Sequence, residues 1–193
     1  MINCNECTGS DFVKGKYKGF PVEFCDIAIK EVYTKSDGDT TTSLIFKGQW
    51  LEISLNKQLS SAVYLAERIG SNTITGSGKM QEVKTENDAF NKKYQILAED
   101  PHMAFYVLTP HFMEYITAAD RAADSVTYFC FKGSRVRVAM GSKDNERDLF
   151  ELGKLKKNTN LNWVRSKVKS DLQYITGTLD ELLKNEYLFG QGR

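Results

Sequence analysis

The pair Cys4 and Cys7 has the CxxC spacing that thiol chemistry and metal binding both use. A structural zinc site needs four ligands, and no second CxxC pair or spaced histidine pair completes this one. Thioredoxin-like redox chemistry needs the pair at a strand-to-helix junction, whereas these cysteines lie in a polar end without periodicity. The pattern favours incidental cysteines, and an intermolecular zinc or disulfide linkage is the alternative.

The other residues with catalytic potential form no complete motif. His102 and His111 do not belong to an H-E-x-x-H pattern, and no serine lies in a G-x-S-x-G turn. The run Gly76–Lys79 contains part of a phosphate-binding loop, but Thr73 and Met80 occupy two positions that the motif requires for glycine and a hydroxyl residue. The sequence therefore predicts no catalytic residue, no cofactor and no metal ligand.

A basic stretch before and within the last amphipathic segment points to a partner. It contains no acidic residue between its first and last lysine, and it includes Trp163. Such a surface could bind an anionic membrane or another polyanion, because each basic group near an anionic membrane contributes about 1 kcal/mol. The favoured interpretation, however, is a solvated helix face whose apolar seam (Leu161, Val164 and Val168) packs in the core. The candidate contact residues are Lys154, Lys156, Lys157, Arg165, Lys167 and Lys169.

Two alternating stretches near the N-terminus predict an antiparallel hairpin. Apolar residues alternate over Phe20–Tyr33 and Thr41–Leu55, and the intervening Asp37–Gly38 is a strong turn signal. A change of phase near Cys25 predicts a β-bulge there, and Gly48 predicts a second bulge or bend.

Two helix starts carry clear capping chemistry in the middle of the chain. Asp100 and Thr109 each precede a proline, which is favourable at the first helical position because its missing N–H would have no partner there. The second of these helices should end near Ala119. Residues 62–69 fit a strand or a short helix equally well, and periodicity does not decide between them.

The remaining elements follow from periodicity and turn residues. We expect short strands at residues 82–84 and 94–98, and a hairpin of residues 126–131 and 135–140 across Lys132-Gly133-Ser134. A three-to-four-residue repeat of apolar positions predicts a long helix from Leu161 to Leu182, which Gly177 could interrupt.

The composition is that of an ordinary globular protein. The chain has 193 residues, of which 41% are hydrophobic and 26% charged, and this is enough for a sizeable core. Lys and Arg number 26 against 25 Asp and Glu, so the net charge does not indicate a nucleic-acid binder. No membrane-spanning run or signal peptide is visible, so we expect this chain to be soluble as it stands. Four cysteines are too few for a disulfide scaffold and favour a reducing compartment.

Several motifs along the chain carry a family resemblance. They are Gly15–Phe24 (GKYKGFPVEF), Phe46-Lys47-Gly48, Phe90–Asp100 (FNKKYQILAED) and Tyr106–Met113 (YVLTPHFM). On these motifs the chain resembles the bacterial family catalogued as domain of unknown function 3137. The resemblance implies no established activity and no catalytic residues. It also implies membrane-spanning helices ahead of the domain, so we expect either a shortened chain or a naturally soluble relative.

These patterns together predict an α+β fold, with a mainly antiparallel sheet, two short helices and a long C-terminal helix. We expect a loose N-terminal end over residues 1–10, a single domain over 11–185 and a tail over 186–193. The favoured function is a non-enzymatic binding or scaffolding domain of a bacterial membrane-associated protein, held on the cytoplasmic side if the full-length protein is anchored. Its partner would be an anionic membrane surface or a protein, without specific nucleic-acid binding. The alternative is an enzyme whose site is assembled from scattered residues.

Overall fold

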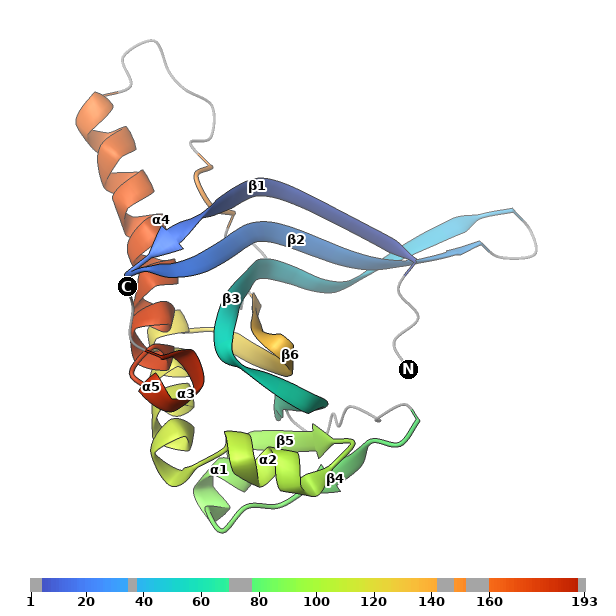
Figure 1. The fold of residues 1–193 in the computed structure, drawn as a ribbon. Coiled ribbons are helices and arrows are strands. Elements are labelled where there is room, and N and C mark those ends of the chain that lie inside the picture. The colour runs from blue at the N-terminus through green and yellow to red at the C-terminus, as the bar shows by residue number, and fades with distance from the viewer. Residues whose placement is uncertain (1–4, 35–37, 70–77, 142–147, 152–159, 191–193) are drawn as a thin grey trace.

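The structure is a computed structural model that describes residues 5–34, 38–69, 78–141, 148–151 and 160–190 (Figure 1). One mainly antiparallel sheet and several helices confirm the α+β class. The described residues hold two short helices, α1 and α5, that the sequence did not predict. The elements are β1 (Glu6–Tyr17), β2 (Phe20–Thr34), β3 (Thr40–Glu67), β4 (Gln81–Val83), α1 (Asp88–Lys93), β5 (Tyr94–Ala98), α2 (Pro101–Val107), α3 (Pro110–Ala123), β6 (Val126–Gly141), α4 (Leu161–Leu182) and α5 (Glu186–Phe189).

The long strand β3 organises the sheet. Its first part lies between β2 and β6, and its last part lies between β5 and β6. Strand β1 pairs with β2 at one edge and β4 pairs with β5 at the other, and every pairing is antiparallel. The predicted pairing of Phe20–Tyr33 with Thr41–Leu55 is confirmed, although residues 35–37 of the predicted turn lie outside the described residues. Residues 62–67 belong to β3, so the strand alternative is correct for them.

The predicted hairpin of residues 126–131 and 135–140 is wrong, because β6 is one strand that runs alongside β3 through both segments. Gly133 does adopt a positive φ of 60°, but it does so within the strand. The register changes from Ser54 opposite Arg135 to Leu59 opposite Gly133, so β3 contains extra residues at this point. Extra residues in one strand of a pair bend both strands. Glycine can adopt the positive φ that such a bend requires, just as it can in a turn.

The predicted bulge near Cys25 lies in the neighbouring strand. Ser10 pairs with Asp26 and Val13 pairs with Phe24, so two residues of β1 oppose Cys25 of β2. Gly48 forms no bulge, because β3 pairs with β2 continuously through it, and the pairing of β3 with β6 begins at Gly48 opposite Gly141.

Gly48 instead allows β3 and β6 to approach closely. A Cβ atom at this position would lie 2.1 Å from the carbonyl oxygen of Met140, which is far inside a van der Waals contact. Only a residue without a side chain fits this crossing.

Both expected chain ends contain regular structure. Residues 6–10 were expected to be loose but form the start of β1, paired to β2. The expected tail over 186–193 is wrong for α5, where Leu188 and Phe189 are buried. A polar strand at a sheet edge has no apolar alternation to reveal it, because both of its faces are largely exposed.

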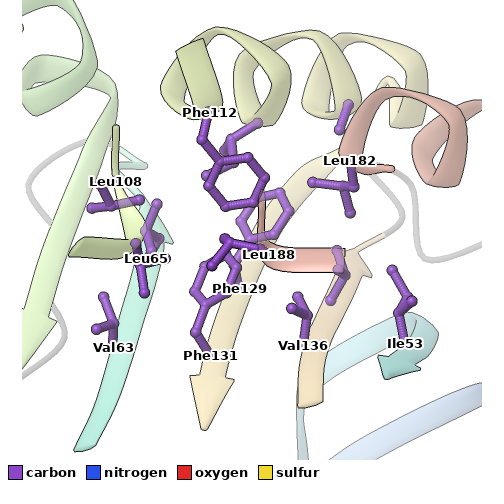
Figure 2. Close-up of a cluster of buried hydrophobic side chains, with 14 of the residues drawn as sticks. Ile53, Val63, Leu65, Leu108, Phe112, Phe129, Phe131, Val136, Leu182 and Leu188 are labelled. Atoms are coloured by element: carbon purple, nitrogen blue, oxygen red, sulfur yellow. The ribbon is translucent and has the colours of Figure 1, made fainter. Parts of the chain in front are cut away.

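The core lies between the sheet and the helices α3, α4 and α5 (Figure 2). Figure 2 shows Phe129 and Phe131 of β6 beneath Phe112 of α3, with Leu182 and Leu188 beside them. The predicted caps are confirmed: the Asp100 carboxylate accepts the His102 N–H at 2.9 Å, and the Thr109 hydroxyl accepts the Phe112 N–H at 3.3 Å. Helix α3 runs four residues beyond the predicted end, to Ala123.

Candidate functional site

The first half of α4, residues 161–170, lies clear of the core. Figure 1 shows the helix extending past the end of β1, away from the other helices. None of residues 161–170 is buried, and Leu161 is 71% exposed. The expectation that Leu161, Val164 and Val168 pack in the core is therefore wrong, since Val164 and Val168 are only half-buried. The buried residues of α4 are Asp171, Ile175, Thr178, Leu179 and Leu182.

Apolar and basic side chains share this protruding surface. Trp163 is 50% exposed, and Leu172, about two and a half turns further along the helix, is 40% exposed. Arg165 and Lys169 are exposed and have no acidic neighbour in the sequence of the first half of α4. The structure thus places three of the six predicted basic residues on one projecting helix half, and two of them, Arg165 and Lys169, are exposed. Lys154, Lys156 and Lys157 lie outside the described residues.

Lys167, another of the predicted contact residues, is already engaged within the fold. Its ammonium group donates to both carboxylate oxygens of Asp171, at 2.7 and 2.6 Å, and its side chain is 31% exposed. Asp171 also accepts the Phe150 N–H at 2.9 Å. Because Asp171 neutralises it, Lys167 contributes less positive charge to the surface than Arg165 or Lys169 does.

A second buried carboxylate completes the attachment of residues 148–151. Asp26 of β2 accepts the Leu149 N–H at 2.6 Å and the side-chain amide of Gln49 at 2.9 Å. We call Asp26 and Asp171, which hold consecutive backbone N–H groups, the carboxylate clasp. Phe150 has a φ of 57°, an uncommon left-handed conformation for a residue with a side chain. The clasp holds this segment against both the sheet and α4 at the base of the protruding half.

The electrostatics of the clasp fit a structural role. Burial raises the pKa of the Asp26 carboxyl, although the hydrogen bonds from Gln49 and Leu149 act in the opposite direction. A raised carboxyl pKa is a common feature of catalytic acids. The Asp26 oxygens, however, are buried and already accept hydrogen bonds from this chain.

A second group of charged residues joins the ends of four elements. Lys93, at the end of α1, forms an ion pair with the buried Asp120 of α3 and lies 3.9 Å from Glu67 of β3. Thr127 of β6 donates its hydroxyl to Asp120 at 2.7 Å and its N–H to Glu67 at 3.2 Å. Lys93 offsets one of the two acidic charges of this group, and the hydrogen bonds of Thr127 help to hold the element ends together.

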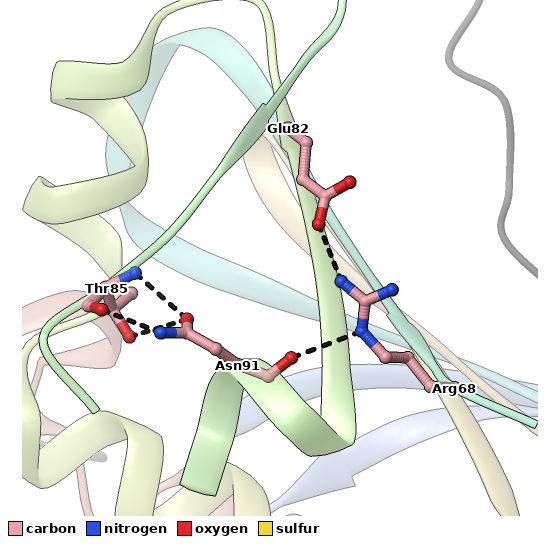
Figure 3. Close-up of polar contacts among 4 residues, drawn as sticks. All are labelled: Arg68, Glu82, Thr85 and Asn91. Atoms are coloured by element: carbon pink, nitrogen blue, oxygen red, sulfur yellow. Dashed lines mark hydrogen bonds and ion pairs between the residues drawn. The ribbon is translucent and has the colours of Figure 1, made fainter. Parts of the chain in front are cut away.

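The polar contacts around α1 and β4 likewise join elements of the fold to one another (Figure 3). The Arg68 guanidinium donates to Glu82 at 2.6 Å and to the carbonyl of Asn91 at 3.2 Å. The Asn91 side-chain amide donates to the carbonyl of Thr85 at 2.7 Å, and its oxygen accepts the Thr85 N–H at 2.9 Å. These contacts hold the end of β3, β4 and α1 together.

The cysteines and histidines gather at no common site in the described structure. Burial raises the pKa of the Cys25 and Cys130 thiols, which keeps them in their less nucleophilic, protonated form. His102 and His111 are exposed near the helix starts. Within the described ranges no three His, Cys, Asp or Glu residues are placed to hold a metal ion, and no helix is long and apolar enough to cross a membrane. Cys4 lies outside those ranges, so the expected absence of a metal stays a prediction.

Sequence reasoning missed the carboxylate clasp, although one half of it left a signal. Asp26 follows Val22 and Phe24 at alternate positions of β2, so it occupies a core-facing position of the strand. An acid in the apolar series of a strand indicates a buried group with dedicated hydrogen-bond partners. Asp171 left a weaker signal: it is the first acid after the basic stretch and stands four residues after Lys167.

Comparisons with known proteins identify a fold neighbour and a family. A search of curated proteins gives no match. The crystal structure of the mycobacterial trehalose monomycolate transport factor A, TtfA, matches 92% of this chain and 74% of its own with a TM-score of 0.52. At 10% sequence identity this likeness shows a shared fold alone. The sequence model of the family "Protein of unknown function (DUF3137)" matches residues 44–184, from β3 through the end of α4. The chain therefore belongs to the DUF3137 family of proteins of unknown function.

Proposed function

We propose that this domain is a non-enzymatic binding domain whose contact surface is the first half of α4 and whose partner is an anionic membrane surface. The observation that carries the proposal is a helix half without buried residues that exposes Leu161, Trp163, Arg165 and Lys169 together. A helix half that packed in the core would bury its apolar residues. Basic groups combined with exposed leucine and tryptophan are typical of helices that bind at the membrane interface.

The charge of the surface favours an anionic partner. Among the described residues Arg165 and Lys169 form no ion pair, and no acid lies beside them in the first half of α4, whereas Lys167 is paired with Asp171. Each basic group near an anionic leaflet contributes about 1 kcal/mol, so the two described cations contribute about 2 kcal/mol together. This gives weak, salt-sensitive association, which a membrane anchor elsewhere in the protein would strengthen through a high effective concentration.

The family and the fold neighbour are consistent with this role. DUF3137 carries no assigned activity, and TtfA is described as a transport factor rather than as an enzyme. If the full-length protein is anchored in a membrane, we expect the surface to face the cytoplasmic leaflet, because anionic lipids give that leaflet its negative potential.

Vesicle sedimentation tests the proposal. The domain should pellet with vesicles of phosphatidylcholine and phosphatidylserine at low salt and remain in the supernatant with pure phosphatidylcholine. Binding should disappear as salt rises, because the Debye length falls from about 10 Å at 0.1 M to about 3 Å at 1 M. Failure to pellet with acidic vesicles at low salt would refute the membrane proposal and leave a protein partner as the remaining reading of the surface.

A further inference from the structure

We infer that a second surface of this domain binds an acidic, proline-rich segment of another protein. The surface lies where α2, α5 and the bend of β3 meet, away from the first half of α4. With both surfaces occupied, the domain is an adaptor that holds a protein partner beside a membrane. We call this surface the aromatic patch, and its residues are Lys57, Phe105, Tyr106 and Tyr187.

Three elements that are distant in sequence form the aromatic patch. The ring centroids of Tyr106 in α2 and Tyr187 in α5 lie 5.5 Å apart, with 60° between the ring planes. The Lys57 ammonium group, from β3, lies 4.7 Å from the centroid of the Tyr187 ring. Phe105 adjoins Tyr106 in α2. The fold therefore gathers side chains that the sequence keeps apart.

The aromatic rings of the patch are exposed although their neighbours in the chain are buried. Phe105 is 50% exposed, Tyr106 is 39% exposed and Tyr187 is 52% exposed. Within the described ranges, Tyr106 and Tyr187 are the one pair of contacting rings in which both members are exposed. Exposed apolar groups gathered in one place mark an interaction site, and rings on fixed elements lose little entropy when a partner binds. The buried neighbours that fix α2 and α5 are Ala104, Val107, Leu188 and Phe189.

The polar groups of the aromatic patch are mainly hydrogen-bond donors. The hydroxyls of Tyr106 and Tyr187 form a hydrogen bond with each other, which leaves one of the two O–H groups free to donate. The Lys57 ammonium has three N–H groups. Lys57 forms no ion pair with a described acid, and this includes the exposed Glu186 at the start of α5. A complementary partner therefore supplies acceptors and negative charge.

An acidic, proline-rich segment has both properties. In the polyproline II conformation the backbone carbonyls have no internal hydrogen bond, and proline has no N–H, so the segment offers acceptors. Such segments are recognised by surfaces lined with aromatic side chains. Because the segment is already extended, it loses little conformational entropy on binding. An acidic side chain within it would pair with Lys57.

The aromatic patch and the first half of α4 are far enough apart to be occupied together. Helix α5 follows the C-terminal end of α4, whereas the proposed membrane surface is its N-terminal half. At about 1.5 Å per residue, Leu161 and Leu182 lie about 30 Å apart along the helix axis. Figure 1 shows α5 at the end of α4 that is remote from its first turn.

NMR titration with a short peptide of repeated Pro-Pro-Glu tests the inference. The peptide should shift the backbone amide signals of α2, α5 and residues 55–59 of β3. Tyr187→Ala should weaken binding at least tenfold, because tyrosines at the centre of an interface carry much of its affinity. Tyr33→Ala is the matched control, since Tyr33 is 64% exposed near the end of β2, and it should bind like the wild type. Thermal melting of both variants checks that they fold.

Exchange of charge tests the chemistry of the partner. Wild-type protein should bind the Pro-Pro-Glu peptide more tightly than a peptide of repeated Pro-Pro-Lys. Lys57→Glu should reverse this preference, because the new carboxylate repels glutamate and attracts lysine. Lys84→Glu makes the same change in net charge at an exposed lysine after β4 and should keep the wild-type preference.

Each outcome decides the inference independently of the proposed function. Shifts at the aromatic patch that Tyr187→Ala weakens, together with the reversed preference of Lys57→Glu, support it. An absence of shifts, shifts that Tyr187→Ala leaves unchanged, or equal binding of the two peptides by the wild type overturns it. Weaker pelleting of Tyr187→Ala with acidic vesicles, without peptide binding by the wild type, assigns the patch to the membrane and also overturns it. Membrane binding through α4 stands or falls by the vesicle sedimentation described above.

Discussion

Replacement of Asp171 by asparagine should lower stability and strengthen membrane binding in the same variant. In the wild type the Asp171 carboxylate accepts two contacts from Lys167, at 2.7 and 2.6 Å, and one from the Phe150 N–H at 2.9 Å. Asparagine keeps one oxygen as an acceptor for the Phe150 N–H. It removes the charge that holds Lys167 and places a buried N–H₂ group beside the lysine ammonium.

The expected loss of stability follows from these contacts. A hydrogen bond to a charged group contributes about 1.5–3 kcal/mol when buried. The Lys167 side chain is 31% exposed, so solvent screening reduces the value, and we expect a loss of about 1–2 kcal/mol. For a chain of this size the melting temperature falls by about 2–4 °C per kcal/mol, which predicts a decrease of about 4 °C in a thermal melt.

The expected gain in binding comes from the freed lysine. One further basic group near an anionic leaflet is worth about 1 kcal/mol, or about a fivefold increase in affinity for acidic vesicles. Glu86→Gln is the control, since it removes one exposed acid between β4 and α1 and changes the net charge equally. If Asp171→Asn melts like the wild type, the clasp is not a stabilising contact. If it binds vesicles no better than Glu86→Gln, Lys167 does not face the membrane.

Four further predictions concern the fold. Gly48→Ala should lower the melting temperature by about 4–8 °C, because a Cβ 2.1 Å from the Met140 carbonyl forces the strands apart at a cost of at least about 2 kcal/mol. Gly177→Ala, where the new Cβ would lie 3.7 Å from its nearest neighbour in a helix interior, should instead stabilise the protein by about 1 kcal/mol, and a loss in this variant would show that the helices pack closer than described. Because the pKa of the Asp26 carboxyl is raised in the folded state, the unfolded chain releases the carboxyl proton at lower pH, and the free energy of unfolding should fall as pH rises from about 4 through the folded pKa. Asp26→Asn should remove that part of the pH dependence, measured by denaturant titration at several pH values. If the free energy of unfolding of Asp26→Asn varies with pH as in the wild type, the assignment to Asp26 is contradicted. Thr109→Ala should cost about 0.5–2 kcal/mol through loss of the helix cap, and an unchanged denaturation midpoint would show that the cap does not contribute.

Local chemistry made several parts of the fold predictable. The caps at Asp100 and Thr109 were predictable because a carboxylate or hydroxyl before a proline is typical of a helix start. The pairing of β2 with β3 followed from alternation and the intervening glycine. The same signals predicted a turn at Gly133, where the structure has a bend within β6. Glycine is compatible with both, and the extra residues of β3 that favour the bend lie far from Gly133 in sequence.

The candidate surface shows a different limit of prediction. Apolar spacing correctly predicted an amphipathic helix over Leu161–Leu182, and the interruption considered at Gly177 does not occur. Spacing does not say where the covering sheet ends, so the burial of Leu161 was predicted wrongly. In the same way, the run of basic residues was visible in sequence and Asp171 stands four residues after Lys167, but the hydrogen bond that Asp171 also accepts from the Phe150 N–H joins segments that are distant in sequence.

Charge reversal on α4 tests membrane binding through this helix most directly. The measurement is sedimentation of Arg165→Glu/Lys169→Glu with acidic vesicles at low salt, beside the control Lys84→Glu/Lys92→Glu. The control has the same change in net charge on two exposed lysines near α1, at the other end of the molecule from the start of α4 (Figure 1). The account predicts that the α4 variant stays in the supernatant while the control pellets with most of the wild-type affinity. Equal pelleting of the two variants would contradict it.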